Sequence, residues 1–159
     1  MTTRINHFQA APALAKALSD ASIASHKSSL DPTIKNLIEI RVSQLNGCAF
    51  CLDMHVKQAK LKEERELRIH HLSIWRESPL FSAKEKAALA LAEALTRISE
   101  HGVSDELYRA MQEHFSETQL SELTFAIALI NTWNRLQILS RMTPGALDAA
   151  QGLDRANLR

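Results

Sequence analysis

Residues 46–55 read Asn46-Gly47-Cys48-Ala49-Phe50-Cys51-Leu52-Asp53-Met54-His55, and they contain both cysteines of the chain. Asn-Gly is a helix-breaking pair, and the residues after it are good helix formers, so the stretch predicts a helix that starts at about Cys48. At about 100° per residue, Cys48, Cys51 and His55 fall within about 60° of one another on one face of that helix. Two thiols and an imidazole therefore share its first turns.

This arrangement favours thiolate chemistry. The thiolate is the nucleophile, whereas a free thiol is mostly protonated at neutral pH. A helix N-terminus stabilises negative charge through its unpaired N–H groups and the helix dipole. His55, one turn after Cys51, can accept the thiol proton or pair with the thiolate, and the second cysteine can close a disulfide. We therefore interpret Cys48, Cys51 and His55 as a redox site.

Two other interpretations of the cysteines stay open. They can be small buried core residues, or they can join His55 and either His70 or His71 as zinc ligands. A structural zinc site usually draws on two separated ligand pairs, and this chain has one such pair, so redox chemistry is favoured over a metal site. Haem attachment is excluded because Leu52 stands where the motif C-x-x-C-H requires histidine.

Composition narrows the class of protein. A chain of 159 residues with a net charge of +1 is long enough for one domain. Lysine and arginine form no runs, so we expect neither a nucleic-acid partner nor a membrane partner. The N-terminus has no apolar signal segment, and the longest apolar run, 125–130, is too short to span a bilayer, so we expect a cytoplasmic protein. There, C-x-x-C indicates redox or metal chemistry.

The rest of the chain shows helical periodicity and no convincing strand alternation, so we predict an all-α fold of about six to seven helices. Asp31 and Pro32 form an N-cap followed by an N1 proline, and capping boxes start at Ser82 and Ser116. The segment 63–76 forms one helix or two. The predicted helices span about residues 7–25, 32–45, 48–61, 63–76, 83–98, 105–114 and 117–141.

These helices predict one domain over residues 1–143, followed by a loose tail over 144–159 after Pro144-Gly145. A small helical domain with wide apolar faces also predicts a homo-oligomer. The polar stretch 131–135 is unusual in the middle of a long helix, and we interpret it as interior hydrogen bonding or a subunit contact. Candidate core positions are Phe8, Leu14, Leu18 and Ile23 in the first helix, and Leu67, Leu72 and Trp75 in the fourth.

Residues 37–55, Leu-Ile-Glu-Ile-Arg-Val-Ser-Gln-Leu followed by the cysteine motif, closely resemble the core of the alkylhydroperoxidase AhpD-like, carboxymuconolactone decarboxylase superfamily. Residues 81–90 and 130–136 are also similar to its small single-domain members, and the resemblance covers about residues 8–143. It implies an AhpD-like helical fold that assembles as a trimer or hexamer. It also implies that the C-x-x-C pair reduces peroxides or passes electrons to a peroxiredoxin.

By position, Cys48 and Cys51 match the redox pair of this family, and His55 matches its proton-relay histidine. One position departs from the family pattern. Where the family often has a relay glutamate, twelve residues before the first cysteine, this chain has Asn36, which cannot titrate. Glu39, three residues later and roughly on the same helix face, is a candidate substitute; the alternative is an ordinary exposed glutamate.

The residues and the resemblance together predict a thiol-dependent antioxidant oxidoreductase, in which His55 and Glu39 activate Cys51 to attack a peroxide and Cys48 resolves the product. The alternative is that Cys48 attacks, since it lies nearer the helix terminus. An external dithiol then restores the pair. No dinucleotide fingerprint is present, so we expect no bound NAD(P)H or flavin. Two alternatives stay open: a redox-sensing helical oligomer without turnover, and a decarboxylase-type enzyme, although the decarboxylase branch generally lacks C-x-x-C.

Overall fold

The structure is a computed structural model that describes residues 3–158. Residues 1, 2 and 159, which the predicted domain and tail include, lie outside the described residues. Over 3–158 the chain is all-α, as predicted, with nine α-helices and two 3-10 helices. None of the described helices has the length and apolar character needed to cross a membrane. The helices are α1 (His7–Ala10), α2 (Pro12–His26), α3 (Pro32–Asn46), α4 (Ala49–Leu61), α5 (Glu66–His71), η1 (Leu72–Ile74), α6 (Ala83–Thr96), α7 (Asp105–Gln112), α8 (Glu117–Ser140), α9 (Asp148–Gln151) and η2 (Leu153–Ala156).

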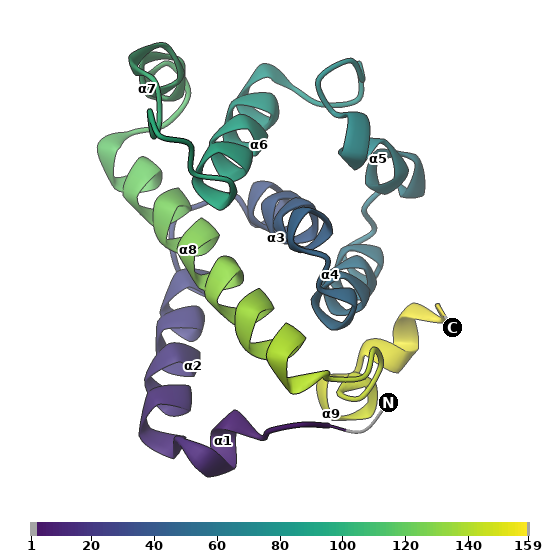
Figure 1. Cartoon of the computed structure of the whole chain (residues 1–159). Helices are drawn as coiled ribbons and strands as arrows, with labels where there is room; N and C mark the ends of the chain where they lie inside the picture. The colour runs from purple at the N-terminus through teal and green to yellow at the C-terminus, as the bar shows by residue number, and fades with distance from the viewer. Residues whose placement is uncertain (1–2, 159) are drawn as a thin grey trace.

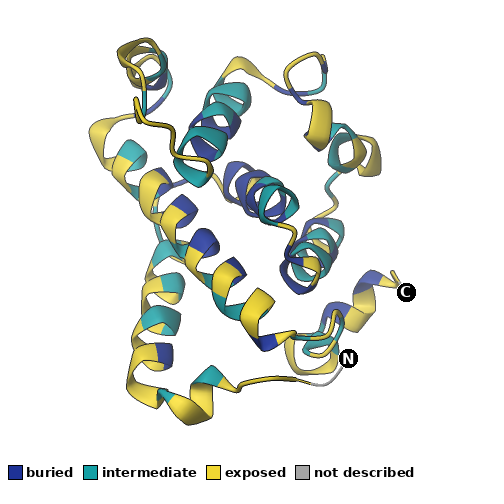
Figure 2. Cartoon of the chain, in the orientation of Figure 1, coloured by how far each residue is buried: buried dark blue, intermediate teal, exposed yellow. Residues whose placement is uncertain are grey.

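Helix α3 is the central element of the fold. It packs against α4, α6 and α8, which surround it in Figure 1. Every residue from 34 to 40 is buried, so α3 appears mostly dark blue in Figure 2. Burial around the whole circumference leaves three polar side chains, Lys35, Asn36 and Glu39, inside the molecule.

Local capping signals set the starts of the long helices. The Asp31 side chain accepts a hydrogen bond at the start of α3, and both predicted capping boxes are formed, at Ser82 before α6 and at Ser116 before α8. Helix α8 is 24 residues long and crosses α3, with α2 packed on its other side (Figure 1). Helices α2, α3, α4 and α8 enclose the cavity that is described below.

Two predicted helices are interrupted. The predicted helix 7–25 breaks at Ala11, where φ is −142°, because Pro12 restricts the residue before it and starts α2 at its own N1 position. The predicted segment 63–76 becomes helical only at Glu66, because Glu63 has a positive φ of 61° and turns the chain. It then forms α5 and η1 rather than one helix.

The predicted core is correct at Leu72 and Trp75 and wrong at Leu67, which is 51% exposed. Leu67 lies on the short helix α5, whereas Leu72 lies on η1, the element that packs against α3. Helical spacing could not show which of these leucines lies in the core, and Ile69 of α5 packs against the core although Leu67 does not. Phe8, Leu14 and Ile23 on α1 and α2 are exposed as well.

The prediction of a loose tail after residue 143 is wrong. Residues 148–156 form α9 and η2, and η2 packs against α4, where Leu153 and Ala156 are buried. The physical reason is that these two apolar side chains find a surface on α4 that sequence alone does not reveal.

Lys57 on α4 anchors this C-terminal segment. Its buried ammonium lies 2.8 Å from Asp53 and 2.7 Å from Asp148, and Asp53 also accepts the N–H of Gly145. Burial acts to lower the pKa of Lys57, but the hydrogen bonds to Asp148 and Asp53 outweigh it and hold the pKa above its ordinary value. The C-terminal segment is thus joined to α4 by an ion pair as well as by apolar contacts.

Glu93 on α6 joins three segments of the chain. One carboxylate oxygen accepts from the Trp75 indole at 2.9 Å and from Arg41 of α3 at 2.6 Å, and the other lies 2.6 Å from Arg76. Burial acts to raise the pKa of this carboxyl, but the hydrogen bonds from Trp75, Arg41 and Arg76 outweigh it, so the pKa lies below its ordinary value.

We expect Glu93→Gln to lower the free energy of unfolding at pH 7 by about 1–3 kcal/mol, because a hydrogen-bonded charge is lost from a partly buried network. Since the folded-state pKa is depressed, the stabilisation is fully present above the ordinary pKa of 4.5 and is lost as pH falls through the folded-state value. Urea unfolding at pH 7 and pH 3 measures both effects. Glu106→Gln, at an exposed pair, is the control. An equal difference between wild type and Glu93→Gln at both pH values would contradict the assignment.

Candidate active site

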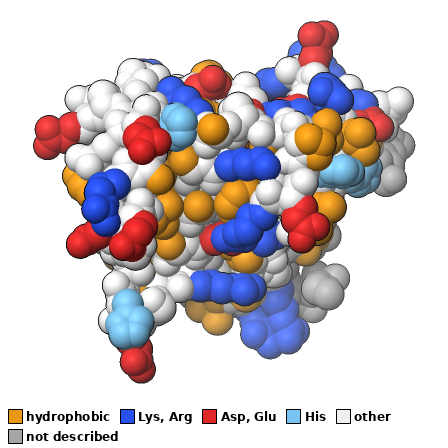
Figure 3. All heavy atoms as spheres, turned by 90° about the horizontal axis from the view of Figure 1, so that it is seen from above, with side chains coloured by type: hydrophobic (Ala, Val, Ile, Leu, Met, Phe, Trp, Pro, Cys, Tyr) orange, Lys and Arg blue, Asp and Glu red, His pale blue; other side chains and the backbone are white. Residues whose placement is uncertain are grey.

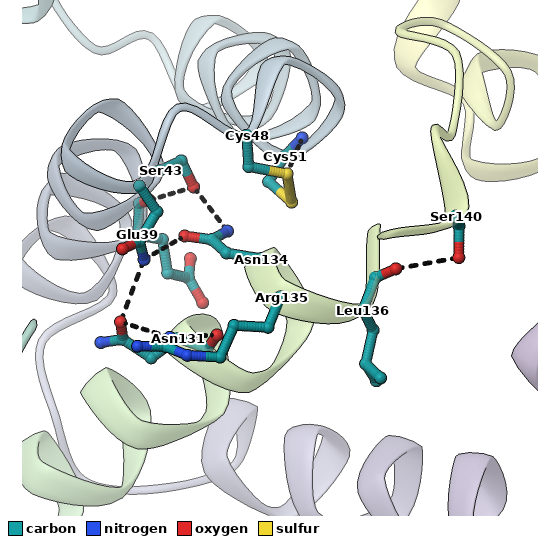
Figure 4. Close-up of a disulfide and its surroundings, with 10 residues drawn as sticks. Glu39, Ser43, Cys48, Cys51, Asn131, Asn134, Arg135, Leu136 and Ser140 are labelled. Carbon is teal, nitrogen blue, oxygen red and sulfur yellow. Dashed lines mark hydrogen bonds between the residues drawn. A yellow bond between two sulfur atoms is a disulfide. The ribbon is translucent and has the colours of Figure 1, made fainter. Parts of the chain in front are cut away.

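The cysteine motif lies at a sharp turn between α3 and α4. Gly47 ends α3 with φ of 70°, a left-handed conformation that favours glycine. Cys48 is the N-cap of α4, so the helix starts at Ala49, one residue later than predicted, and the Cys48 sulfur accepts the N–H of Cys51 at 3.3 Å. Cys48 and Cys51 form a disulfide, drawn in Figure 4, and both residues are buried.

A network of amides holds this turn against α8. The Asn46 side chain donates to Asn131 at 3.0 Å and to Asn134 at 2.9 Å, and Asn134 donates to Ser43 of α3 (Figure 4). Arg135 also donates to the Asn131 side chain. The interpretation of the polar stretch 131–135 as interior hydrogen bonding is therefore confirmed. The network fixes the end of α3 directly before the cysteines.

His55 is 5% exposed and is oriented from one side of its ring. Its Nδ1 lies 2.9 Å from the Gln58 side-chain oxygen and 3.4 Å from a carboxylate oxygen of Glu39. Two acceptors beside Nδ1 favour the tautomer that carries its hydrogen there. Nε2 is buried and has no hydrogen-bond partner within residues 3–158. The ring therefore presents an unpartnered acceptor nitrogen, on the same helix as Cys51 and one turn after it.

The structure separates the roles of Glu39 and Asn36. Glu39 is 8% exposed and adjoins the His55 ring, so the alternative of an ordinary exposed glutamate is wrong. Asn36 is buried too, but its amide donates to the backbone carbonyl of His55 at 3.2 Å rather than to the ring. Glu39 is thus the carboxylate beside the imidazole, and Asn36 holds the backbone of α4 against α3.

Cys51, His55 and Glu39 line one cavity of about 370 Å³ between α2, α3, α4 and α8. Leu147 and Gln151 of the C-terminal segment also line it, whereas Cys48 does not. A volume of this size is at the lower end of the range for small-molecule sites. Of the two cysteines, Cys51 is therefore the one that lines the cavity.

Sequence reasoning missed Lys35, His26 and Trp133, which line the same cavity. Burial lowers the pKa of Lys35, and Glu39 partly offsets this effect; burial and then Lys35 lower the pKa of His26. The signal in the sequence was a lysine and a glutamate four residues apart in a helix that is otherwise apolar on most sides. Two charges in such a helix indicate a functional interior rather than a solvated face.

The histidines considered as zinc ligands lie elsewhere. His70 is exposed, and the Nδ1 atom of His71 is 3.1 Å from the Ser78 hydroxyl. In the part of the chain that the structure describes, no three His, Cys, Asp or Glu side chains are grouped to hold a metal ion.

Charges of both signs are mixed on the surface of the protein. On the face seen in Figure 3, acidic side chains lie among the basic ones, with apolar side chains between them.

Comparison with known sequences gives the family. The model of the carboxymuconolactone decarboxylase family matches residues 9–94, which include all of α3, α4 and the cysteine motif. The chain belongs to this carboxymuconolactone decarboxylase family. Uncharacterized protein YdfG of Bacillus subtilis is 44% identical to this family member over 138 residues, which cover 87% of this chain and 94% of YdfG. Uncharacterized protein YnjA of Escherichia coli is 35% identical over 130 residues, which cover 81% of this chain and 67% of YnjA.

Solved structures agree with this family assignment. ATU0492 of Agrobacterium tumefaciens, described as a protein of unknown function and a candidate antioxidant defence protein AhpD, superposes with a TM-score of 0.86 at 38% identity over 91% of this chain and 99% of that chain. The debrominase Bmp8 superposes with a TM-score of 0.75 at 22% identity over 91% of this chain and 77% of its own, which shows a shared fold alone. The carboxymuconolactone decarboxylase family member described here therefore has the AhpD-like fold predicted from its sequence.

Proposed function

We propose that this protein is a thiol-dependent antioxidant oxidoreductase that reduces peroxides with its Cys48–Cys51 pair. The observation that carries the proposal is the unpartnered Nε2 of His55, buried one turn from Cys51 while Glu39 and Gln58 hold Nδ1. An acceptor nitrogen beside a thiol is the arrangement that activates a cysteine nucleophile. The description of ATU0492, at 38% identity, supports the same class of activity.

In the reduced protein, Nε2 of His55 takes the proton of the Cys51 thiol. The Glu39 carboxylate, 3.4 Å from Nδ1, stabilises the imidazolium that results. Cys51 lies in the first turn of α4, where the free N–H groups and the helix dipole stabilise its thiolate. The protein itself therefore stabilises both the Cys51 thiolate and the His55 imidazolium.

The Cys51 thiolate then attacks the terminal oxygen of a hydroperoxide. The S–O bond forms as the O–O bond breaks, and the leaving alkoxide takes the proton from His55 and departs as an alcohol. Cys51 is now a sulfenic acid, and the Cys48 thiol attacks its sulfur, which forms the S–S bond and releases water. The two thiols have supplied the two electrons that reduce the peroxide.

An external dithiol, or the thiols of a peroxiredoxin partner, must reduce the disulfide by exchange between turnovers. This cycle uses no bound cofactor. It also fits the cytoplasm, where thiols are kept reduced, and we propose that compartment.

We also propose that the protein is a homo-oligomer. Apolar side chains of α1 and α2 are exposed together, with Leu14 at 75%, and they adjoin α8 through the stacked rings of Phe8 and Trp133. Helix α8 also exposes apolar side chains, among them Phe125 and Leu139. Several large apolar side chains exposed together are typically covered by another subunit.

The first prediction from the proposed function concerns the Cys51 thiol in a Cys48→Ser background, in which it titrates alone. We expect a thiol pKa below the ordinary value of about 8.5, because His55 and the helix N-terminus stabilise the thiolate, and a rise towards that value in His55→Ala. The rate of alkylation by iodoacetamide against pH measures it. His70→Ala, at an exposed histidine, is the matched control. An ordinary thiol pKa that is indifferent to His55 would contradict the proposal.

The second prediction assigns the cysteines. With dithiothreitol and cumene hydroperoxide, we expect steady turnover by wild type and none by Cys51→Ser, because Cys51 faces the cavity. Cys48→Ser retains a peroxide-dependent sulfenate, detected by mass after dimedone labelling. The reverse pattern would reassign the attacking sulfur.

The alternatives predict other outcomes of the same assay. A single round of disulfide formation without turnover would indicate the redox sensor. Enzymatic activity on a lactone substrate that survives loss of both cysteines would indicate the decarboxylase-type enzyme.

The third prediction concerns assembly. Light scattering at micromolar concentration is expected to give the mass of a trimer or hexamer, as the family resemblance implies. Leu14→Glu should shift the mass towards the monomer without loss of helicity, because it places a charge in the apolar face. Ile98→Glu, at an exposed apolar residue after α6, is the matched control. A monomeric wild type would refute the assembly.

A further inference from the structure

The cavity contains a buried cation that the proposed chemistry does not use. Lys35 on α3 is 6% exposed, and its ammonium donates to the Ser25 hydroxyl of α2 at 3.0 Å. Among the residues that the structure describes, no carboxylate lies within 4.0 Å of it. An ammonium has three donors, so two remain for another acceptor. Burial of a charge without such compensation is costly, which makes this lysine a feature to explain.

The neighbours of Lys35 favour an anion as the missing acceptor. Ser25 accepts the bond from Lys35, and no bond in which its own hydroxyl donates is formed within residues 3–158. Both residues line the cavity, so unused donors face the same space. Glu39 is the acidic residue that lines the cavity, and it lies against Nδ1 of His55. Its charge offsets part of the effect of burial on the pKa of Lys35, so charge balance for Glu39 is the competing explanation.

The order of groups along the cavity sets Lys35 apart from the thiol. Helices α3 and α4 fold back on each other at Gly47, and Asn36 contacts the His55 backbone across them. Lys35 precedes Glu39 by one turn of α3, and Cys51 precedes His55 by one turn of α4. Because Glu39 adjoins His55, this pair lies between the ammonium and the sulfur.

The rest of the cavity wall is largely apolar. Phe50 of α4 and Ile130 and Trp133 of α8 line it. The indole N–H of Trp133 donates a hydrogen bond to the Ser22 hydroxyl. A space of about 370 Å³ that presents an apolar wall, the Lys35 ammonium and, in the reduced protein, the Cys51 thiol suits a small molecule with a charged end and a reactive end.

We propose that the cavity selects an amphipathic organic anion as its peroxide substrate, with a carboxylate bound by Lys35 and Ser25 and an apolar body against Phe50, Ile130 and Trp133. The hydroperoxide group at the other end then reaches Cys51. This inference rests on the proposed peroxidase activity for its substrate class. The recognition of the anion by Lys35 can be tested without that activity.

Turnover is compared for two substrates that differ mainly in charge, 8-hydroperoxyoctanoic acid and its methyl ester, which carries one additional methyl group. Wild type is expected to have a kcat/KM at least about tenfold higher for the acid, because a desolvated charge-assisted hydrogen bond is made to it alone. Lys35→Met, which keeps an unbranched side chain, removes this preference, because the acid loses its charged partner and the ester does not. Lys35→Arg retains the preference. Equal rates for acid and ester in wild type, or an equal loss of both in Lys35→Met, would overturn the proposal.

Binding of unreactive octanoate to the disulfide form, measured by titration calorimetry, separates recognition from catalysis. Octanoate is expected to bind wild type and Lys35→Arg, and to bind Lys35→Met at least about tenfold more weakly, while octanol binds all three alike. Circular dichroism melting confirms that each variant is folded. If octanoate binds through Lys35 but no peroxide is turned over, the proposed function fails and the anion site stands. If octanoate does not bind, the anion site is refuted, whatever the peroxide kinetics.

Discussion

The packing of α3 against α4 across the turn at Gly47 is the constraint on which the site depends. It surrounds α3 with other helices and so buries polar side chains that a surface helix would expose. It also sets Glu39 beside His55, although sixteen positions separate them in the chain. Because buried polar groups must be partnered, the same packing forces Asn36 onto a backbone carbonyl and leaves a single unpartnered nitrogen, Nε2, on the His55 ring. The buried nitrogen that packing leaves without a hydrogen-bond partner is the group that can accept a proton in such a site.

The fold itself does not decide the chemistry. One protein of similar fold is a debrominase, and the family is named for a decarboxylase. A shared helical scaffold supports different reactions through the side chains that line its cavity. Here those side chains are a cysteine that can form a disulfide with its neighbour, an oriented imidazole and a buried ammonium. The cysteines and the imidazole suit redox chemistry at sulfur, and the ammonium suits recognition of charge.

Local sequence signals were sufficient wherever a short-range interaction sets the structure. The capping boxes at Ser82 and Ser116 form as predicted because both hydrogen bonds lie within four residues. The prediction failed where the result depends on a distant surface. Leu67 and Leu72 were both predicted as core positions, yet one is exposed and the other buried, because Leu72 lies on η1, which packs against α3. The ordered segment 148–156 depends in the same way on α4.

The sequence by itself determined that the protein is helical, that Cys48, Cys51 and His55 share one helix end, and that the chain resembles the family to which it belongs. Spacing along a helix decides these features, because residues three and four apart lie on one face in any helix. Only the tertiary structure decided that Glu39 adjoins the imidazole and that Lys35 is a buried cation in the same cavity. Burial and contact between helices arise from packing, and no local pattern encodes which face of a helix meets which neighbour.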